Sequence, residues 1–572
     1  MGISLSIGFL CVRRLSSGGR DNERHHSGYT VPVVQYNQKE SREDMTSVFQ
    51  DKLMIGLAMA LYMSVIIGIG LYYAKRSHSS TDEYFLGGRS LGPYVTALSA
   101  GASDMSGWLL MGLPGLAYWI GIGDAFWTAV GLAVGTYLNW LIIARRLRVY
   151  SHIADNAVTI PDFFSNRFME KEEDRKSILA IASLFILIFF IIYAASCFVT
   201  VGKLFSALFG LNYVWMMIAG ALFVFIYTYL GGFLAESTSD FLQGIVMILA
   251  LVTVLITGTV AAGGVGAVIE NAQNIPGFLD FFGKATPQLD ASGQQIMENG
   301  LPGFGSREDL GWVTIISNLA WGLGYFGVPQ VLLRFMAIRD ADEIKVARRV
   351  GTVWAVVSLF AAIVIGMIGR VLLPNQFTSL TAAENIFALL AQSLMPAFVA
   401  GIVMAGILAA TISSADSYLL IAASAVSKNI YKGIFRKKAT DRQVMAVTRI
   451  TLIVTTILGI LFALDENSVI FNIVSFAWAG FGATFGPALL FSLFSKRVTR
   501  QGILAGMVTG GLTVLIWNLM LSQFGGIFSI YELLPAFILS CLAIILISSK
   551  TQTSQAVREQ HIRYITELEK EN

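Results

Sequence analysis

The sequence predicts an all-α polytopic membrane protein with about 13 transmembrane helices, and three observations support this fold class. Of the 572 residues, 55% are hydrophobic and 13% are charged, whereas about a quarter of the residues in soluble domains are charged. The mean hydropathy is +0.66. The 55 glycines are typical of closely packed membrane helices.

Thirteen apolar runs are long enough to cross a bilayer, which takes about 20 mostly apolar residues. They lie near 53–73, 93–115, 123–144, 178–201, 212–230, 239–262, 311–336, 350–373, 389–415, 443–463, 470–494, 502–521 and 531–548. Lysine and arginine gather in the loops after the first, third, seventh, ninth and eleventh runs. Because basic loops stay cytoplasmic, we expect a plasma-membrane protein with its N-terminus outside and its C-terminus inside.

The second run, "SAGASDMSGWLLMGLPG" (99–115), carries an aspartate, Asp104, among small residues. A carboxylate at this depth costs about 2.5–3.5 kcal/mol on insertion scales, so it needs a cation, a helix end or water as a partner. The surrounding glycines make an unwound turn inexpensive, and such a turn frees backbone carbonyls and amides. The segment therefore predicts a broken helix that binds an ion or a substrate. The alternative is a packing face on which Asp104 bonds to a neighbouring helix.

A second interrupted run is "WGLGYFGVPQVLLRF" (321–335), in which glycines and Pro329 weaken the helix. Trp321, Tyr325 and Pro329 recur every four residues and would share one face of a helix. On its own, this pattern fits ordinary aromatic packing equally well. Two interrupted runs that each begin five helices are, however, the pattern of an inverted repeat.

Two further groups of polar residues interrupt apolar runs. "AGILAATISSADSYLL" (405–420) holds the adjacent hydroxyls of Ser413 and Ser414, followed by Asp416. These oxygens suit Na⁺, although serines also commonly bond back to the preceding helical turn. "GGFLAESTSDF" (231–241) contains Glu236 and Asp240, which we interpret as solvated charges, or less readily as a second cation site or inner gate paired with loop arginines.

We divide the chain on this basis into seven parts. They are 1–48, a disordered N-terminal extension or misassigned start; 49–92, a peripheral first helix and cytoplasmic loop; 93–262, a first inverted repeat; 263–310, an extracellular loop; 311–498, a second repeat; 499–549, two C-terminal helices; and 550–572, a cytoplasmic tail.

The stretch "GGRSLGPYVTALSAGASDMSGWLLMGLPG" (87–115) resembles the sodium/solute symporter family, most closely the bacterial sodium/proline symporters. The resemblance continues through "FFIIYAAS", "YTYLGGFLA", "WGLGYFGVP", "RFMA", "AGILAATISS" and "FAWAGFGATFGPALLFSL", and covers about 50–545. It implies a leucine-transporter-like core of two inverted five-helix repeats, with one helix before it and two after it. It also implies sodium-coupled symport of L-proline into the cell by alternating access.

The resemblance assigns roles to individual residues. For Na⁺ it implies the backbone oxygens of Ala102, Met105 and Ala410 and the hydroxyls of Ser413 and Ser414, with Asp104 needed for sodium coupling. For the substrate it implies Ser106, Gly107, Trp108, Tyr193, Trp321, Tyr325 and Pro329. Arg89 matches an arginine implicated in coupling, and we expect Asp240 and Asp416 to support a possible second cation site.

Other classes of function fit less well. The five histidines all lie outside the apolar runs, and no nucleophile–histidine–acid set or phosphate-binding loop lies in the spans, which argues against an enzyme. The tail after 549 is too short for the output domain of a membrane sensor. A symporter of another compatible solute, pantothenate or a sugar stays open, as does a channel. We expect neither a nucleic-acid ligand nor an obligate protein partner.

Overall fold

The computed structural model describes residues 38–77, 80–171, 173–298 and 300–570. The chain separates into two units, residues 1–49 and 50–572, and the description below concerns the second. The expected N-terminal extension falls mostly on residues 1–37, outside the described residues. Residues 38–48 of it are helical, at the start of α1 (Gln38–Ser77).

The first half of the helical bundle runs to residue 261. It comprises α2 (Thr81–Leu86), the turn η1 (Gly87–Arg89), α3 (Pro93–Gly107), η2 (Trp108–Gly112), α4 (Leu113–Ile120), α5 (Ile122–Leu138), η3 (Asn139–Ala144), α6 (Arg145–Ile153), α7 (Ile160–Arg167), α8 (Asp174–Phe209) and α9 (Tyr213–Ala261).

The second half begins after the segment 262–310. It comprises α11 (Gly311–Ala320), η4 (Trp321–Phe326), α12 (Pro329–Ala337), α13 (Ile344–Leu372), α14 (Leu380–Ala383), α15 (Ile386–Leu394), α16 (Ala397–Ser424), η5 (Ala425–Phe435), α17 (Asp441–Phe462) and α18 (Ile470–Phe494). The C-terminal part adds α19 (Arg500–Ile516), the short turns η6 (Trp517–Leu521), η7 (Ser522–Phe524) and η8 (Gly526–Ser529), α20 (Leu533–Lys550) and α21 (Gln555–Lys570).

Ten helices of the described residues are long and apolar enough to cross a membrane. This number is lower than the thirteen apolar runs because two of the runs form broken helices. The path α3–η2–α4 leaves helical geometry at Ser106 (φ 41°, ψ −167°), and α11–η4–α12 contains a 3₁₀ segment followed by the extended residue Val328. In addition, α9 joins two runs across a kink at Gly232 (φ 63°, ψ −175°).

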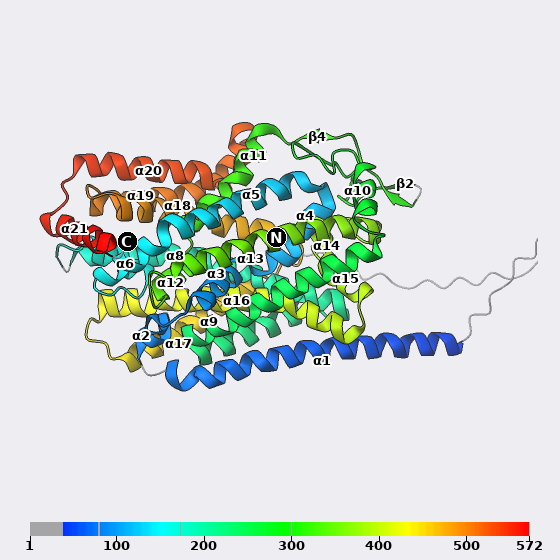
Figure 1. Cartoon of the computed structure of the whole chain (residues 1–572), viewed down its shortest axis with the longest axis horizontal. Coiled ribbons are helices and arrows are strands. Elements are labelled where there is room, and N and C mark those ends of the chain that lie inside the picture. Colours follow the sequence, from blue (N-terminus) through cyan, green and yellow to red (C-terminus); the bar gives the residue numbers. More distant parts are fainter. Residues whose placement is uncertain (1–37, 78–79, 172, 299, 571–572) are drawn as a thin grey trace, which may run out of the picture. The chain divides into compact units, whose positions relative to one another are not determined.

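Two segments that sequence analysis treated as connections contain regular structure. The segment 263–310 forms α10 (Val265–Gln273) and two antiparallel strand pairs, β1 (Gly283–Lys284) with β4 (Glu308–Asp309) and β2 (Met297–Glu298) with β3 (Leu301–Pro302). The tail forms α21, which packs on α6 at the opposite end of the bundle (Figure 1). Its pattern of polar residues around a few apolar positions hides the helix from a search for apolar runs.

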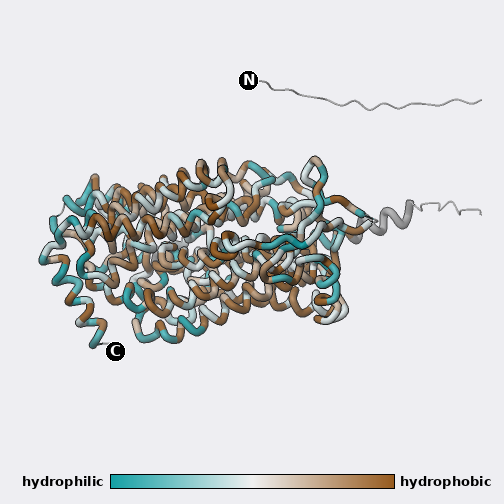
Figure 2. The backbone as a smooth tube through the Cα atoms, turned by 90° about the horizontal axis from the view of Figure 1, so that it is seen from above, coloured by the Kyte–Doolittle hydropathy of each residue, from teal (hydrophilic) through white to brown (hydrophobic). Residues whose placement is uncertain are grey.

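The helix α16 lies at the centre of the packing, in contact with α3, α8 and α9. Residues 403–425 of this path are all buried, so the helix presents no polar face to its surroundings and its polar side chains point into the bundle. Figure 2 shows hydrophobic residues along the long helices and hydrophilic residues concentrated toward the two ends. The bundle therefore places the broken part of α3 against the serine pair of α16.

Candidate cation and substrate site

The break in α3 lies at the positions that sequence analysis indicated. Ser106 is a non-glycine residue with a positive φ, a conformation that costs of order 1–3 kcal/mol and persists only where the surroundings enforce it. The next residue, Gly107, packs so closely on Thr200 of α8 that a Cβ atom there would overlap it. The strained turn is thus fixed by its neighbour.

The serine pair of α16 faces this break. The Ser413 hydroxyl donates a hydrogen bond to the carbonyl of Ala102 at 2.8 Å and lies 3.1 Å from the carbonyl of Ala410. The Ser414 hydroxyl donates to the same Ala102 carbonyl at 3.3 Å. Two hydroxyls and two carbonyls therefore converge from helices whose contacting residues are 311 and 312 positions apart in the sequence. Oxygens of this kind are ligands for hard cations. Met105, the fifth expected ligand, instead accepts a hydrogen bond at its carbonyl from the Trp108 amide.

The Asp104 side chain is directed to a different neighbour. Its Oδ2 accepts a hydrogen bond of 2.6 Å from the Tyr325 hydroxyl of η4, and its backbone carbonyl accepts one of 3.3 Å from Tyr193. Its Oδ1 is buried without a partner among the described residues. Asp104 therefore connects the first broken helix to the second, and no hydrogen bond joins its carboxylate to Ser413 or Ser414 in the described part of the chain.

A small cavity of about 20 Å³ adjoins Asp104. It is also lined by Thr136 of α5, Asn139 of η3 and Tyr325. The polar side-chain atoms of Thr136 and Asn139 are buried and lack partners within the described residues. This volume and these groups suit one ordered water. Neither residue is indicated by the sequence patterns, since each is a single polar residue in an apolar run.

Aromatic rings lie on one side of the break. The ring centroids of Trp108 and Trp321 lie 6.1 Å apart, and Trp321 also lies 4.9 Å from Phe471. Tyr325 contacts Trp478 edge-on at 5.0 Å. The expected single helical face of Trp321, Tyr325 and Pro329 does not form, because 321–326 is a 3₁₀ turn and Pro329 starts α12 after the chain becomes extended.

Asp240 belongs to a buried charged cluster. The guanidinium of Arg334, on α12, binds Glu236 and lies 2.9 Å from both Asp240 Oδ2 and the Ser417 hydroxyl. Ser99 of α3 donates to the same Asp240 oxygen at 2.7 Å. Asp240 is thus not a solvated interface charge.

Asp416 lies beside this cluster and differs from its members. Its Oδ1 accepts the amide of Ser417 at 2.7 Å, and its Oδ2 is buried without a partner among the described residues. Three carboxyl groups then accompany one guanidinium, so complete ionisation would leave two uncompensated negative charges. Arg334 is among the residues that the sequence analysis did not indicate, although a single arginine within the apolar stretch "VLLRF" was an available signal.

Arg89 occupies the end of the bundle that contains α6 and α21. Its guanidinium donates to Asn156, Ser151 and the carbonyls of Met336 and Ala157 at 2.5–3.0 Å. Burial and the nearby Arg148 lower the pKa of Arg89 to about 10. Arg89 therefore fastens the loop before α3 to α6 and to the end of α12.

A buried ion pair fastens the opposite end. The Lys203 ammonium of α8 lies 2.6 Å from Glu384 Oε2 and 2.6 Å from the Ser468 carbonyl, and Glu384 Oε1 accepts the Ile470 amide. The pair joins α8 to the segment between α14 and α15 and to the start of α18. The sequence feature that could have indicated this ion pair is the single charged residue, Lys203, within the apolar part of α8.

Comparisons with known proteins place the chain among related sequences and folds. The profile of the Sodium:solute symporter family matches residues 84–510. Sodium/proline symporters of Staphylococcus aureus, from strains USA300 / TCH1516 and JH9, are each 38% identical over 521 residues, which cover 90% of this chain and 96% of theirs. The substrate-bound outward-open structure of a Na⁺-coupled sialic acid symporter has a TM-score of 0.68 at 18% identity and covers 88% of this chain and 99% of that one.

The chain therefore belongs to the sodium:solute symporter family. It is a polytopic membrane transporter with Na⁺ as its coupling ion. The expected resemblance and the leucine-transporter-like fold are confirmed.

Proposed function

We propose that this chain carries L-proline into the cell together with Na⁺ by alternating access. The observation that carries the proposal is the meeting of the Ala102 carbonyl with the Ser413 and Ser414 hydroxyls beside the broken helix. The 38% identity to sodium/proline symporters over 90% of the chain supports proline as the solute.

Na⁺ would bind where these oxygens converge. The ligands would be the carbonyls of Ala102 and Ala410 and the two hydroxyls, with Met105 joining once its carbonyl leaves the Trp108 amide. Both hydroxyls now donate to the Ala102 carbonyl, so they would turn their hydrogens away and present lone pairs to the ion. Na⁺ would thereby replace two hydrogen bonds between α3 and α16 by a stronger link.

Proline would bind on the other side of the same turn. Its carboxylate would accept hydrogen bonds near Ser106 and Gly107, where the Ser106 hydroxyl is buried and has no partner among the described residues. Its ring would lie against Trp108, Trp321 and Tyr325, whose faces offer apolar contact and attraction for the imino cation. Tyr193 and Pro329 would border this space, and Tyr193 already bonds the Asp104 carbonyl.

Coupling follows because ion and solute share one turn. Na⁺ bound at the Ala102 carbonyl would hold the turn in one conformation. In that conformation the backbone amides near Ser106 and Gly107 point toward proline, so each ligand raises the affinity of the other. Asp104 would transmit this effect to the second broken helix through Tyr325. Arg89 and the Lys203–Glu384 pair would close the two ends of the pathway in alternation.

A second cation beside Asp416 would offset part of the negative charge around Arg334. The free Asp416 Oδ2 and Asp240 Oδ1 are its available ligands. The guanidinium of Arg334 already compensates one carboxylate, so we propose this site only as an accessory to the first.

The chain would cross the membrane thirteen times, with the N-terminus outside and the C-terminus in the cytoplasm. The ten long apolar helices, two broken paths and one extra crossing within kinked α9 support this number. The basic loops at the end of the bundle near α6 and α21 support the orientation.

Uptake of labelled proline into proteoliposomes, with and without an inward Na⁺ gradient, tests the function. We expect accumulation only with the gradient, and competition by unlabelled proline but not by pantothenate or sugars. Better competition by another solute would replace proline as the substrate, and uptake without coupling to Na⁺ would contradict symport.

A further inference from the structure

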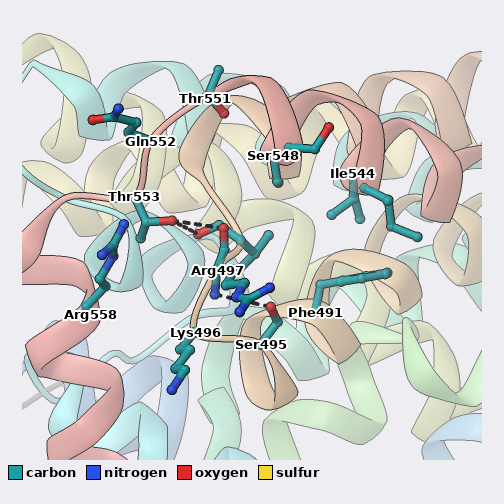
Figure 3. Close-up of a pocket in the computed structure, with 13 residues that line it drawn as sticks. Phe491, Ser495, Lys496, Arg497, Ile544, Ser548, Thr551, Gln552, Thr553 and Arg558 are labelled. Atoms are coloured by element: carbon teal, nitrogen blue, oxygen red, sulfur yellow. Dashed lines mark hydrogen bonds between the residues drawn. The ribbon is translucent and has the colours of Figure 1, made fainter.

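A basic cavity of about 770 Å³ lies at one end of the bundle, apart from the candidate cation and substrate site. Figure 3 shows the side chains that line it. It is enclosed by the end of α18, the loop before α19, the end of α20 and the start of α21. Its volume falls in the range of about 300–1,000 Å³ typical of small-molecule sites.

The polar side of the cavity carries positive charge. Lys496, Arg497 and Arg558 line it, and its lining contains no carboxylate. Among the described residues, none of these three side chains forms an ion pair, whereas Arg500, just beyond the loop, is already paired with Asp174 at 2.9 Å. Three unpaired cations around one cavity favour an anionic ligand.

The backbone of this wall is held in place. The Thr553 hydroxyl donates to the Arg497 carbonyl at 2.9 Å, and the Arg497 amide donates to Ser495 at 3.2 Å. The Thr499 amide donates to Ser548 at 3.2 Å. The hydroxyls of this loop thus tie α18, α20 and α21 together, so the site is formed before a ligand arrives.

The opposite side of the cavity is apolar and leads along α20. Phe491 and Ile544 line it (Figure 3), together with Ile545. Ile545 is 50% exposed, and Leu542 and Ile538, about one and two turns earlier on the same face, are 47% and 49% exposed. Both α18 and α20 are membrane-crossing candidates that end at this cavity, which places it at the boundary between headgroups and hydrocarbon.

We propose that this cavity binds an anionic phospholipid, with its phosphate between Lys496, Arg497 and Arg558 and one acyl chain along Ile545, Leu542 and Ile538. A soluble phosphate would satisfy the charges but would leave the apolar face unused. The lipid would also join α20 to α21, which packs on α6.

The test is the binding of phosphatidylglycerol to the full chain in nanodiscs of phosphatidylcholine, measured by native mass spectrometry. In a K496Q/R497Q/R558Q variant we expect binding to weaken on the order of tenfold to a hundredfold, because each base near a lipid surface contributes to the attraction. The matched control, R436Q/K438Q/R442Q, removes three exposed bases, two from the loop between η5 and α17 and one from the first turn of α17. We expect it to change binding by less than about twofold. Equal binding by the two variants would overturn the proposal.

Two further measurements separate the lipid from a free anion and from misfolding. Inorganic phosphate should fail to displace the lipid; full displacement would assign the site to a soluble anion instead. A phosphatidylglycerol with a photoreactive acyl chain should label residues 538–549 of the unaltered protein. Labelling confined to other helices would overturn the proposal even if the triple variant does not fold.

Discussion

Replacement of Tyr325 by phenylalanine tests how the two broken helices communicate. The substitution keeps the ring that lies 5.0 Å from Trp478 and removes only the hydroxyl that donates to Asp104 at 2.6 Å. Both carboxylate oxygens of Asp104 would then lack a protein donor, since Oδ1 has none among the described residues. A hydrogen bond to a charged group contributes about 1.5–3 kcal/mol, so we expect apparent Na⁺ affinity to fall roughly 10–150-fold.

The assay is the initial rate of labelled proline uptake into proteoliposomes over a range of Na⁺ concentrations. The control is Tyr213→Phe, which removes a buried hydroxyl that donates to the Ala463 carbonyl, between α17 and α18, at 2.7 Å. We expect the control to retain its Na⁺ dependence. Equal Na⁺ dependence of Tyr325→Phe and unaltered protein would refute the coupling role of the Asp104–Tyr325 bond.

Three other predictions concern the ends of the bundle. Arg89→Gln should slow uptake several-fold, as measured by counterflow, without changing the equilibrium binding of Na⁺. Because the pKa of Arg89 is about 10, the guanidinium stays charged at pH 6 and pH 8, and the substitution should slow uptake equally at both. Lys203→Met should lower the free energy of unfolding by about 3–5 kcal/mol, because it leaves the Glu384 charge buried without its partner. In a thermal unfolding assay, Lys203→Met/Glu384→Leu should recover much of this loss. An unchanged melting temperature in the single variant would contradict a stabilising role of the ion pair. Burial, with Arg167 and Lys496 nearby, lowers the pKa of His561 to about 4. The undocked helix therefore binds more protons than the docked one between pH 6.5 and 4, and α21 should detach more often as the pH falls through that window. Hydrogen exchange of residues 555–570 should accelerate there, and His561→Phe should remove this pH dependence.

Much of the fold could be predicted from the sequence because bilayer thickness sets the length of an apolar run. The interruptions were also visible, since glycines and an aspartate are conspicuous in "SAGASDMSGWLLMGLPG". The 3₁₀ form of 321–326 was not, because glycine content shows where a helix weakens and not which backbone replaces it. The same limit explains why the face shared by Trp321, Tyr325 and Pro329 was expected and is not found.

Part of the candidate site could likewise be predicted from the sequence and part could not. The convergence of Ser413 and Ser414 on Ala102 agrees with the ligands expected from the family, whereas the partner of Asp104 does not follow from local sequence. Arg334 was missed because its carboxylate partners lie about 95 residues away on α9, and only the packing of α9, α12 and α16 brings them together. Charge pairing across helices is a property of the tertiary fold and leaves no periodic signal.

The most direct test of the central claim is Na⁺-stimulated binding of labelled proline to purified Ser413→Ala/Ser414→Ala protein. The control is Ser424→Ala on the same helix, which removes a buried hydroxyl that donates to the Ile421 carbonyl of the preceding turn at 2.8 Å. If these hydroxyls and the Ala102 carbonyl hold the coupling ion, the double variant should need at least about tenfold more Na⁺ for half-maximal binding, while the control stays normal. Identical Na⁺ curves for the double variant and the unaltered protein would contradict the account.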